Sequence, residues 1–291
     1  MMKRISFLIV LTILMISCGR RNEPDSKIIS VSIAPFKYFV DGISGGNFKV
    51  NIMVPSGANP HIYEPFPDQI NKLRQSTAYI SNGYLGFEMT WLDRFYEMNS
   101  HMKRLSLGDN IETIKPEHHR EGDLYENADP HFWVSPLCAL KMAESVREFL
   151  AELDPPNRKL YEKNYENLTE RIMQVDSMAK ELSSPGWNRA FMIYHPNLGY
   201  LARDYGLEEI SVEYEGKEPS PSRLKELIDR AKQDKLKVIL VQREYDTKNA
   251  RAIADETGAR VVVIDPLSED WYASTTGMIR VLKDSFEGNV N

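Results

Sequence analysis

Four side chains of the types that bind transition metals stand beside the ends of predicted strands. Two come from each half of the chain, and they are His61, His131, His195 and Asp265. In open α/β sheets ligands bind outside the carboxyl ends of the strands, so polar residues at such positions are the first candidates for a site. Three imidazoles and one carboxylate make a full tetrahedral ligand set for zinc. Together the four residues predict a zinc site, although any one of these histidines alone is typical of a capped turn.

A proline stands directly before or after each of these four residues. Proline fixes its own backbone and restricts the residue before it, which favours rigid presentation of a ligand. Only a neutral imidazole binds a metal, so bound protons must leave as the cation arrives. With an ordinary imidazole pKa near 6.5, binding is expected to weaken below about pH 6.

The chain around these residues alternates short β-branched runs with amphipathic segments. Predicted strands span 28–33, 49–54, 77–81 and 104–107 in the first half, and 190–194, 208–213, 237–242 and 260–264 in the second. Shorter helices are predicted over about 35–44, 67–75, 87–97, 197–205, 221–234, 246–257 and 271–286. This alternation predicts βαβ units and an α/β protein of two lobes with mostly parallel sheets.

Two long helices are predicted between the two halves. Ser135-Pro136 is typical of a helix start and predicts a helix to about Leu153. Apolar residues at three- and four-residue spacing predict a second helix over about 156–183, roughly 40 Å long at 1.5 Å per residue. We expect this helix to link the lobes rigidly. The predicted domains are an N-terminal lobe (28–153), the linking helix (154–185) and a C-terminal lobe (186–291).

The first 17 residues have the layout of a bacterial signal peptide, because Lys3 and Arg4 precede an apolar run of about a dozen residues. That run is too short to cross the roughly 30 Å hydrocarbon core as a helix. Ser17-Cys18 is similar to a lipobox, so we expect lipid on Cys18, a polar tether over 18–27, and a membrane-anchored protein outside the cytoplasm. An ordinary cleaved signal with an incidental cysteine is the alternative.

Composition narrows the classes of partner. Residues 1–17 hold two of the 36 Lys and Arg and none of the 42 Asp and Glu, so 34 basic and 42 acidic residues follow, a net charge of −8. Phosphate binding needs a basic face, so nucleic acid is not an expected partner. Only Cys138 remains once Cys18 carries lipid, which excludes an intramolecular disulfide. We expect a monomer stabilised by packing.

Five segments make the chain similar to a known family. They span 57–65, 129–133, 194–196, 239–244 and 265–267. Over about 28–286 the chain resembles the zinc-uptake solute-binding proteins of bacterial ABC transporters (ZnuA-like), a cluster that also holds manganese binders. The resemblance implies that His61, His131, His195 and Asp265 hold the metal in the cleft between the lobes, and that the chain delivers it to a permease. It also implies that the linking helix limits lobe movement to small adjustments.

The third ligand bears on the choice of metal. Manganese-type relatives commonly place a glutamate there, whereas this chain has His195. Imidazole suits zinc and carboxylates suit manganese. Zn2+ is therefore the expected cargo, and Mn2+ or iron carried by the same class of transporter is the alternative.

A polar stretch before His131 carries a second group of potential ligands. They are Glu117, His118, His119, Glu121 and Asp123. Zinc-type relatives often have a longer loop here, rich in histidine and acids, that is thought to gather metal. A structureless loop of this length is usually functional or disordered. A metal-gathering loop and a merely solvated acidic loop both fit.

Other functions fit parts of the sequence. A metallohydrolase could use Glu64 or Glu244 as a base, but a catalytic zinc needs an open position, and four protein ligands saturate a tetrahedral ion. No His-Glu-x-x-His motif occurs, so we do not expect an enzyme. A lipid-anchored adhesin is allowed, yet no repeat or basic patch specifies a host ligand. Without a phosphate loop or a later transmembrane segment, the permease and the ATPase are expected to be separate chains.

Overall fold

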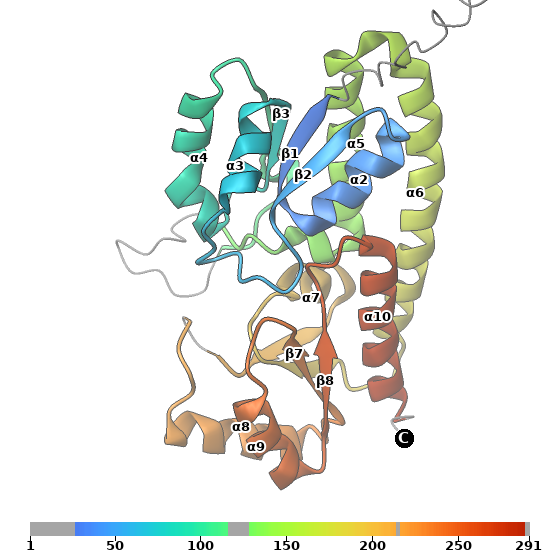
Figure 1. Cartoon of the computed structure of the whole chain (residues 1–291). Helices are drawn as coiled ribbons and strands as arrows, with labels where there is room; N and C mark the ends of the chain where they lie inside the picture. The colour runs from blue at the N-terminus through green and yellow to red at the C-terminus, as the bar shows by residue number, and fades with distance from the viewer. Residues whose placement is uncertain (1–26, 116–127, 214–215, 289–291) are drawn as a thin grey trace, which may run out of the picture.

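Two lobes, each built on a four-stranded sheet, make up the computed structural model of the chain (Figure 1). The structure describes residues 27–115, 128–213 and 216–288. The predicted signal peptide, Cys18 and all five residues of the predicted metal-gathering loop therefore lie outside the described residues. No helix within the described ranges is both long enough and apolar enough to span a bilayer.

The two sheets have the same topology. In the N-terminal lobe β1 (Ile28–Ile33), β2 (Lys49–Val54), β3 (Ser76–Ser81) and β4 (Lys103–Ser106) lie in the order β2-β1-β3-β4. In the C-terminal lobe β5 (Ala190–Ile193), β6 (Glu208–Ser211), β7 (Val238–Gln242) and β8 (Arg260–Ile264) lie in the order β6-β5-β7-β8. Every pairing is parallel. The predicted α/β fold with two parallel sheets is confirmed.

Helices follow the strands as the alternation predicts. Those of the N-terminal lobe are α2 (Ala34–Ser44), α3 (Pro67–Arg74), α4 (Gly86–Met98) and α5 (Pro136–Leu153). Those of the C-terminal lobe are α7 (Gly199–Tyr205), α8 (Pro221–Gln233), α9 (Lys248–Thr257) and α10 (Trp271–Glu287). Proline occupies the first turn of α2, α3, α5 and α8, where its missing N–H would have no helical partner.

The long helix α6 (Arg158–Lys180) runs along both lobes (Figure 1). Its 23 residues span about 35 Å at 1.5 Å per residue. The predicted helix over 156–183 is slightly shorter as α-helix, because single 3₁₀ turns at Pro155–Asn157 and Glu181–Ser183 flank it. One face packs on α2 and α5 of the first lobe and on α10 of the second, so α6 is the expected rigid link.

A pair of buried tryptophans ties the two lobes together beside the cleft. The indole Nε1 of Trp133 donates to the carbonyl of Pro266 at 2.9 Å, and Nε1 of Trp271 donates to the carbonyl of Trp133 at 2.6 Å. Both rings are at most 2% exposed. The two indoles are therefore packing residues, and they fix the segment after His131 against the segment that contains Asp265.

Two expectations about side chains near this junction have different outcomes. Ser135 lies at the predicted N-cap of α5, but its hydroxyl does not cap the helix and donates instead to Asp204 across the lobes. Cys138 is 3% exposed, and burial raises the pKa of its thiol to about 11. The helix N-terminus therefore does not activate this thiol, which is a small packed side chain.

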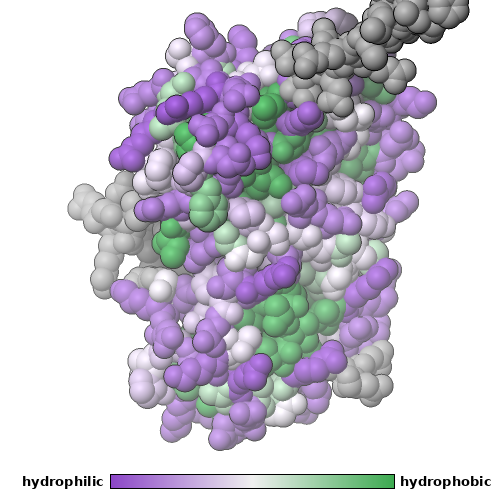
Figure 2. Space-filling view, in the orientation of Figure 1, coloured by the Kyte–Doolittle hydropathy of each residue, from purple (hydrophilic) through white to green (hydrophobic). Residues whose placement is uncertain are grey.

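The edge of the C-terminal sheet shows on the outer face of the molecule. Figure 2, in the orientation of Figure 1, shows a mostly hydrophilic face with a hydrophobic area over β8 and further hydrophobic areas over the N-terminal lobe. Strand β8 is the edge strand of its sheet, and Val263 in it is 57% exposed.

Candidate metal centre

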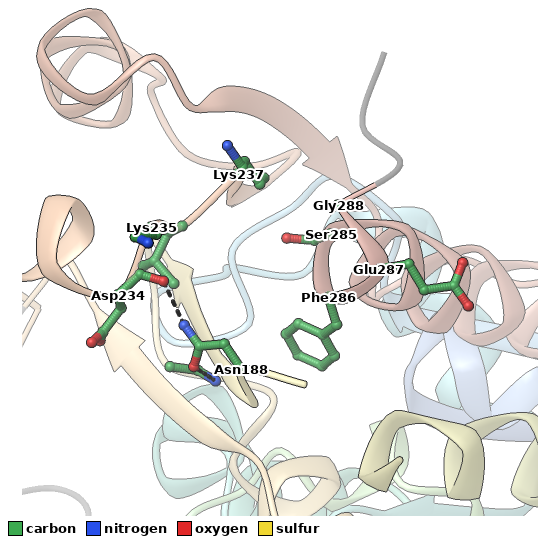
Figure 3. A pocket seen from close by; sticks show the side chains of 10 residues that line it. Asn188, Asp234, Lys235, Lys237, Ser285, Phe286, Glu287 and Gly288 are labelled. Atoms are coloured by element: carbon green, nitrogen blue, oxygen red, sulfur yellow. Dashed lines mark hydrogen bonds between the residues drawn. The ribbon is translucent and has the colours of Figure 1, made fainter. Parts of the chain in front are cut away.

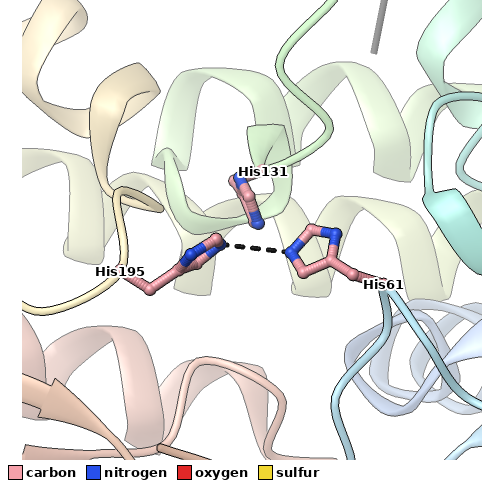
Figure 4. Close-up of side chains that lie close together, drawn as sticks. All are labelled: His61, His131 and His195. Atoms are coloured by element: carbon pink, nitrogen blue, oxygen red, sulfur yellow. Dashed lines mark hydrogen bonds between the residues drawn. The ribbon is translucent and has the colours of Figure 1, made fainter. Parts of the chain in front are cut away.

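Three histidines from three separate segments meet between the lobes (Figure 4). One potential ligand nitrogen from each of His61, His131 and His195 lies within 4.8 Å of the others. The Nε2 atoms of His61 and His195 are 3.1 Å apart, and the three ring centroids are separated by 5.0 to 5.4 Å. Two of the rings come from the N-terminal lobe and one from the C-terminal lobe, so a cation among them would contact both.

His61 lies in a loop that leaves the carboxyl end of β2. Its backbone N–H donates to the Asn59 side-chain oxygen at 2.9 Å, which closes a local turn. The amide of Phe87, at the start of α4, donates to the carbonyl of Pro60 at 3.2 Å. The loop is thus fixed at both its own turn and the neighbouring helix, directly before the histidine.

His131 is held by the carboxylate of Asp129. Oδ1 of Asp129 accepts the backbone N–H of His131 at 2.8 Å and lies 2.7 Å from its Nδ1. The Asn82 side chain, beyond the carboxyl end of β3, donates to the carbonyl of Pro130 at 2.9 Å. A carboxylate on Nδ1 fixes the tautomer that leaves Nε2 free, which is the usual arrangement of a metal-binding histidine.

His195 lies two residues after the end of β5 in the C-terminal lobe, and three side chains contact it. The Gln242 side chain accepts from its backbone N–H at 3.2 Å and donates to its carbonyl. Oε1 of the buried Glu213 lies 3.3 Å from Nδ1. The ring of Tyr245 stacks on the imidazole at 5.0 Å with an interplanar angle of 15°. His195 therefore also presents Nε2 to the cleft.

Burial favours the neutral form of His61 and His195. Burial, and then the two neighbouring imidazoles, lower the pKa of His61 well below 6.5. Burial also lowers the pKa of His195, although the Glu213 carboxylate acts in the opposite direction. The sequence-based expectation used an ordinary imidazole pKa, so the pH at which protonation competes with a metal lies lower than expected from the sequence.

Asp265, the fourth expected ligand, lies outside the group of three histidines. Its Oδ2 accepts from the Ser56 hydroxyl at 2.6 Å and from Nη1 of Arg243 at 3.4 Å. Its Oδ1 is buried and has no hydrogen-bond partner among the described residues. One carboxylate oxygen is thus tied to both lobes while the other is free to bind a cation.

A cavity in the described part of the chain lies elsewhere. It has a volume of about 230 Å³ and lies at the amino ends of β5 and β7, opposite the histidines (Figure 3). Asn188, Lys237 and Phe286 line it, together with the carboxylates of Asp234 and Glu287. Its mixed charges do not favour a single class of ligand, so the histidine cluster remains the candidate site.

Several residues that hold the ligands were not predicted from the sequence. Asp129 stands in a recognised motif, and its position two residues before His131 is typical of a local turn. Glu213 comes 18 residues after His195, and only its place beyond a predicted strand could have indicated it. Which buried carboxylate reaches which imidazole depends on how the loops converge, and the sequence pattern does not contain that information.

Comparison with known proteins gives one consistent result. The sequence profile described as zinc-uptake complex component A, periplasmic (ZnuA) matches residues 29–284. A protein named zinc-binding lipoprotein AdcA, from Streptococcus pneumoniae (strain ATCC BAA-255 / R6), is 27% identical over 282 residues, which cover 91% of this chain and 56% of AdcA. The chain thus spans little more than half the length of that relative.

Two further matches are a relative named for iron and a solved structure described as ZnuA. A protein named iron-binding protein YfeA, from Yersinia pestis, is 30% identical over 236 residues, 78% of this chain and 73% of its own length. A solved structure described as a crystal structure of ZnuA superposes with a TM-score of 0.83 at 36% identity, and covers 90% of this chain and 99% of its own. Proteins named for zinc uptake and for iron binding are therefore both similar in sequence to this chain.

Proposed function

The chain belongs to the family of periplasmic zinc-uptake complex component A proteins, and from this premise we propose that it captures Zn2+ outside the cytoplasm and delivers it to an ABC-type metal permease. Proteins of this family are metal-binding transport components and not enzymes. The observation that carries the proposal is the convergence of three imidazoles from both lobes on one point.

The donor atoms favour zinc over manganese. Nitrogen donors suit zinc, copper and nickel, whereas an oxygen-rich set suits manganese. The third position is the imidazole of His195, whose Nε2 faces His61. A relative named for iron shows that family membership alone does not fix the metal, so Mn2+ or iron remains the second candidate. Copper or nickel binding in vitro would not identify the physiological cargo.

We propose Asp265 as the fourth ligand. A tetrahedral zinc site takes four donors, and the three imidazoles supply only neutral ones. The free Oδ1 of Asp265 is buried, and its partner Oδ2 already contacts Ser56 in the loop that leads to His61. A carboxylate held by both lobes would bind the cation as the lobes close around it.

The remaining parts of the proposal concern where the protein acts and which partners it has. Lipid on Cys18 and a tether over 18–27 would keep the protein at the membrane, where a separate permease and its ATPase receive the metal. The residues Glu117, His118, His119, Glu121 and Asp123 would gather cations near the cleft. We propose a monomer. A role as a surface adhesin is the alternative that needs no permease.

Metal content of the purified protein tests the central step. Residues 19–291, produced without a histidine tag, are dialysed against equal zinc and manganese and analysed by mass spectrometry. We expect about one zinc per parent chain, loss of it in His195→Ala, and retention in His101→Ala, because His101 is exposed and outside the site. Manganese in the parent would favour the second candidate. Equal zinc in the parent and in His195→Ala would refute the cleft site.

A further inference from the structure

Two carboxylates of the C-terminal lobe each have a buried oxygen with no hydrogen-bond partner among the described residues. These oxygens are Oε2 of Glu244 and Oδ1 of Asp265. Burying a charged group costs free energy unless it is paired, hydrogen-bonded or bound to a metal. Such an atom in a folded protein therefore needs an explanation, and an ion is one of the few available. Two of them at one site call for a shared explanation.

The position of Glu244 places it at the wall of the metal centre. It lies in the turn after β7, and both neighbours contact proposed ligands. Nη1 of Arg243 donates to Asp265 at 3.4 Å, and the ring of Tyr245 stacks on His195 at 5.0 Å. Glu244 stands between these two contacts in the chain, so the turn brings it against the same site.

The electrostatics of Glu244 agree with this position. Burial, together with the smaller effect of the Asp265 carboxylate, raises the pKa of its carboxyl to about 7, while its own backbone and His131 act in the opposite direction. Asp265 belongs to the C-terminal lobe and His131 to the N-terminal lobe. Glu244 therefore interacts with proposed ligands on both sides of the cleft.

We propose that Glu244 supplies a second carboxylate to the bound cation, beside Asp265. The inference rests on the proposed capture of metal by the three histidines. Three neutral imidazoles bring no charge, whereas two carboxylates balance the charge of a divalent cation in a buried site. The ion would also provide the partner that both buried oxygens lack. Because carboxylates suit manganese and iron better than imidazoles do, Glu244 would widen the range of metals that this cleft holds.

The test compares Glu244→Gln with Glu226→Gln. The side chain of Glu226 is 66% exposed on α8, so its substitution controls for the loss of one negative charge. Two quantities are measured for the parent and both variants: the zinc dissociation constant by competition with a chelator, and the melting temperature without and with zinc. The parent and both variants also receive manganese in a separate titration.

We expect the two measurements on Glu244→Gln to move in opposite directions. Without metal its melting temperature should equal or exceed that of the parent, because the substitution removes a buried carboxylate beside Asp265. Its zinc affinity should fall by roughly tenfold or more, as is usual when a group supporting a metal is lost. Its manganese affinity should fall by a larger factor. Glu226→Gln should match the parent in every measurement.

Two results would overturn this assignment. Zinc affinity of Glu244→Gln equal to that of the parent would show that the carboxylate does not reach the ion. Weaker binding together with a clearly lower melting temperature of the metal-free variant would assign Glu244 a structural role. A parent chain that binds no zinc would instead refute the proposed function itself, so the two failures can be told apart.

Discussion

The N-terminal and C-terminal lobes contribute different chemistry to one metal centre. In the N-terminal lobe the His131 ring is fixed by the Asp129 carboxylate at 2.7 Å, and the segment around it is tied to Asn82. In the C-terminal lobe His195 has a longer contact of 3.3 Å to Glu213, and two nearby carboxylates each leave an oxygen unpartnered. One lobe thus presents prearranged nitrogen donors, and the other holds two carboxylates that each have one oxygen without a hydrogen-bond partner.

This difference indicates how capture could be coupled to lobe closure. A cation reaching the N-terminal imidazoles replaces water by prearranged nitrogen donors. The carboxylates of Glu244 and Asp265 in the other lobe are then attracted to the cation. Because α6 and the Trp133–Trp271 contacts link the lobes, we expect the lobes to make only small movements when the cation binds.

The largest expected effect comes from removing a prearranged donor. His131→Ala should lower zinc affinity by roughly a hundredfold or more, which exceeds the 10- to 100-fold range typical for residues that only support a ligand. Competition with a fluorescent chelator measures it, and His101→Ala is the matched control. Zinc affinity within a few fold of the parent would contradict the assignment of His131 as a ligand.

Substitution of the carboxylates that hold the histidines should distinguish the contributions of the two lobes to zinc affinity. Asp129→Asn should lower zinc affinity by about 10- to 100-fold, because the carboxylate fixes the tautomer of His131. Glu213→Gln should have a smaller effect, since its contact with His195 is longer by 0.6 Å (3.3 against 2.7 Å). The same titration compares both variants. A larger loss of zinc affinity in Glu213→Gln than in Asp129→Asn would contradict this expectation.

Metal preference should depend on the imidazole of the C-terminal lobe. His195→Glu, combined with Glu213→Gln to remove a like charge beside it, should raise the ratio of manganese to zinc affinity by roughly tenfold, because carboxylates suit manganese. Parallel titrations with both metals measure the ratio. An unchanged ratio of manganese to zinc affinity would show that His195 does not determine the preference for zinc.

The smallest expected effect is on the stability of the metal-free protein at low pH. The pKa values of His61 and His195 are lowered in the folded state, so the unfolded chain binds more protons below its ordinary imidazole pKa near 6.5. These histidines therefore do not penalise folding above that pH and destabilise the fold as the pH falls. The melting temperature of the parent should fall between pH 7.5 and 5.5 more steeply than that of a His61→Ala, His195→Ala double variant. Parallel slopes would show that the two imidazoles are not buried as described.

The sequence predicted the elements and the parallel pairing of the strands. Alternating apolar runs predicted all eight strands, because burial on both faces selects β-branched residues in parallel sheets. The ends were less accurate: α7 starts at Gly199 and not near 197, since the backbone amides of Asn197 and Leu198 donate to the buried Glu209 carboxylate. A contact between segments set that boundary, and local propensity does not report it.

The sequence predicted the donor residues of the site better than the contacts that surround them. Residue type and position after strands singled out three histidines that the fold brings together. The role of Asp265 stays a prediction, because its side chain is tied to Ser56 and Arg243. The lowered pKa values of the histidines and the unpartnered oxygen of Glu244 depend on burial between lobes. Such burial arises only when segments distant in sequence converge.

Anomalous diffraction at the zinc edge from crystals of zinc-loaded residues 19–291 tests the central claim most directly. We expect one strong peak between the lobes, within bonding distance of Nε2 of His61, His131 and His195, with carboxylate oxygens on the side of the C-terminal lobe. A peak bound by residues of one lobe only, or away from the three imidazoles, would contradict the account of a metal centre shared between the lobes.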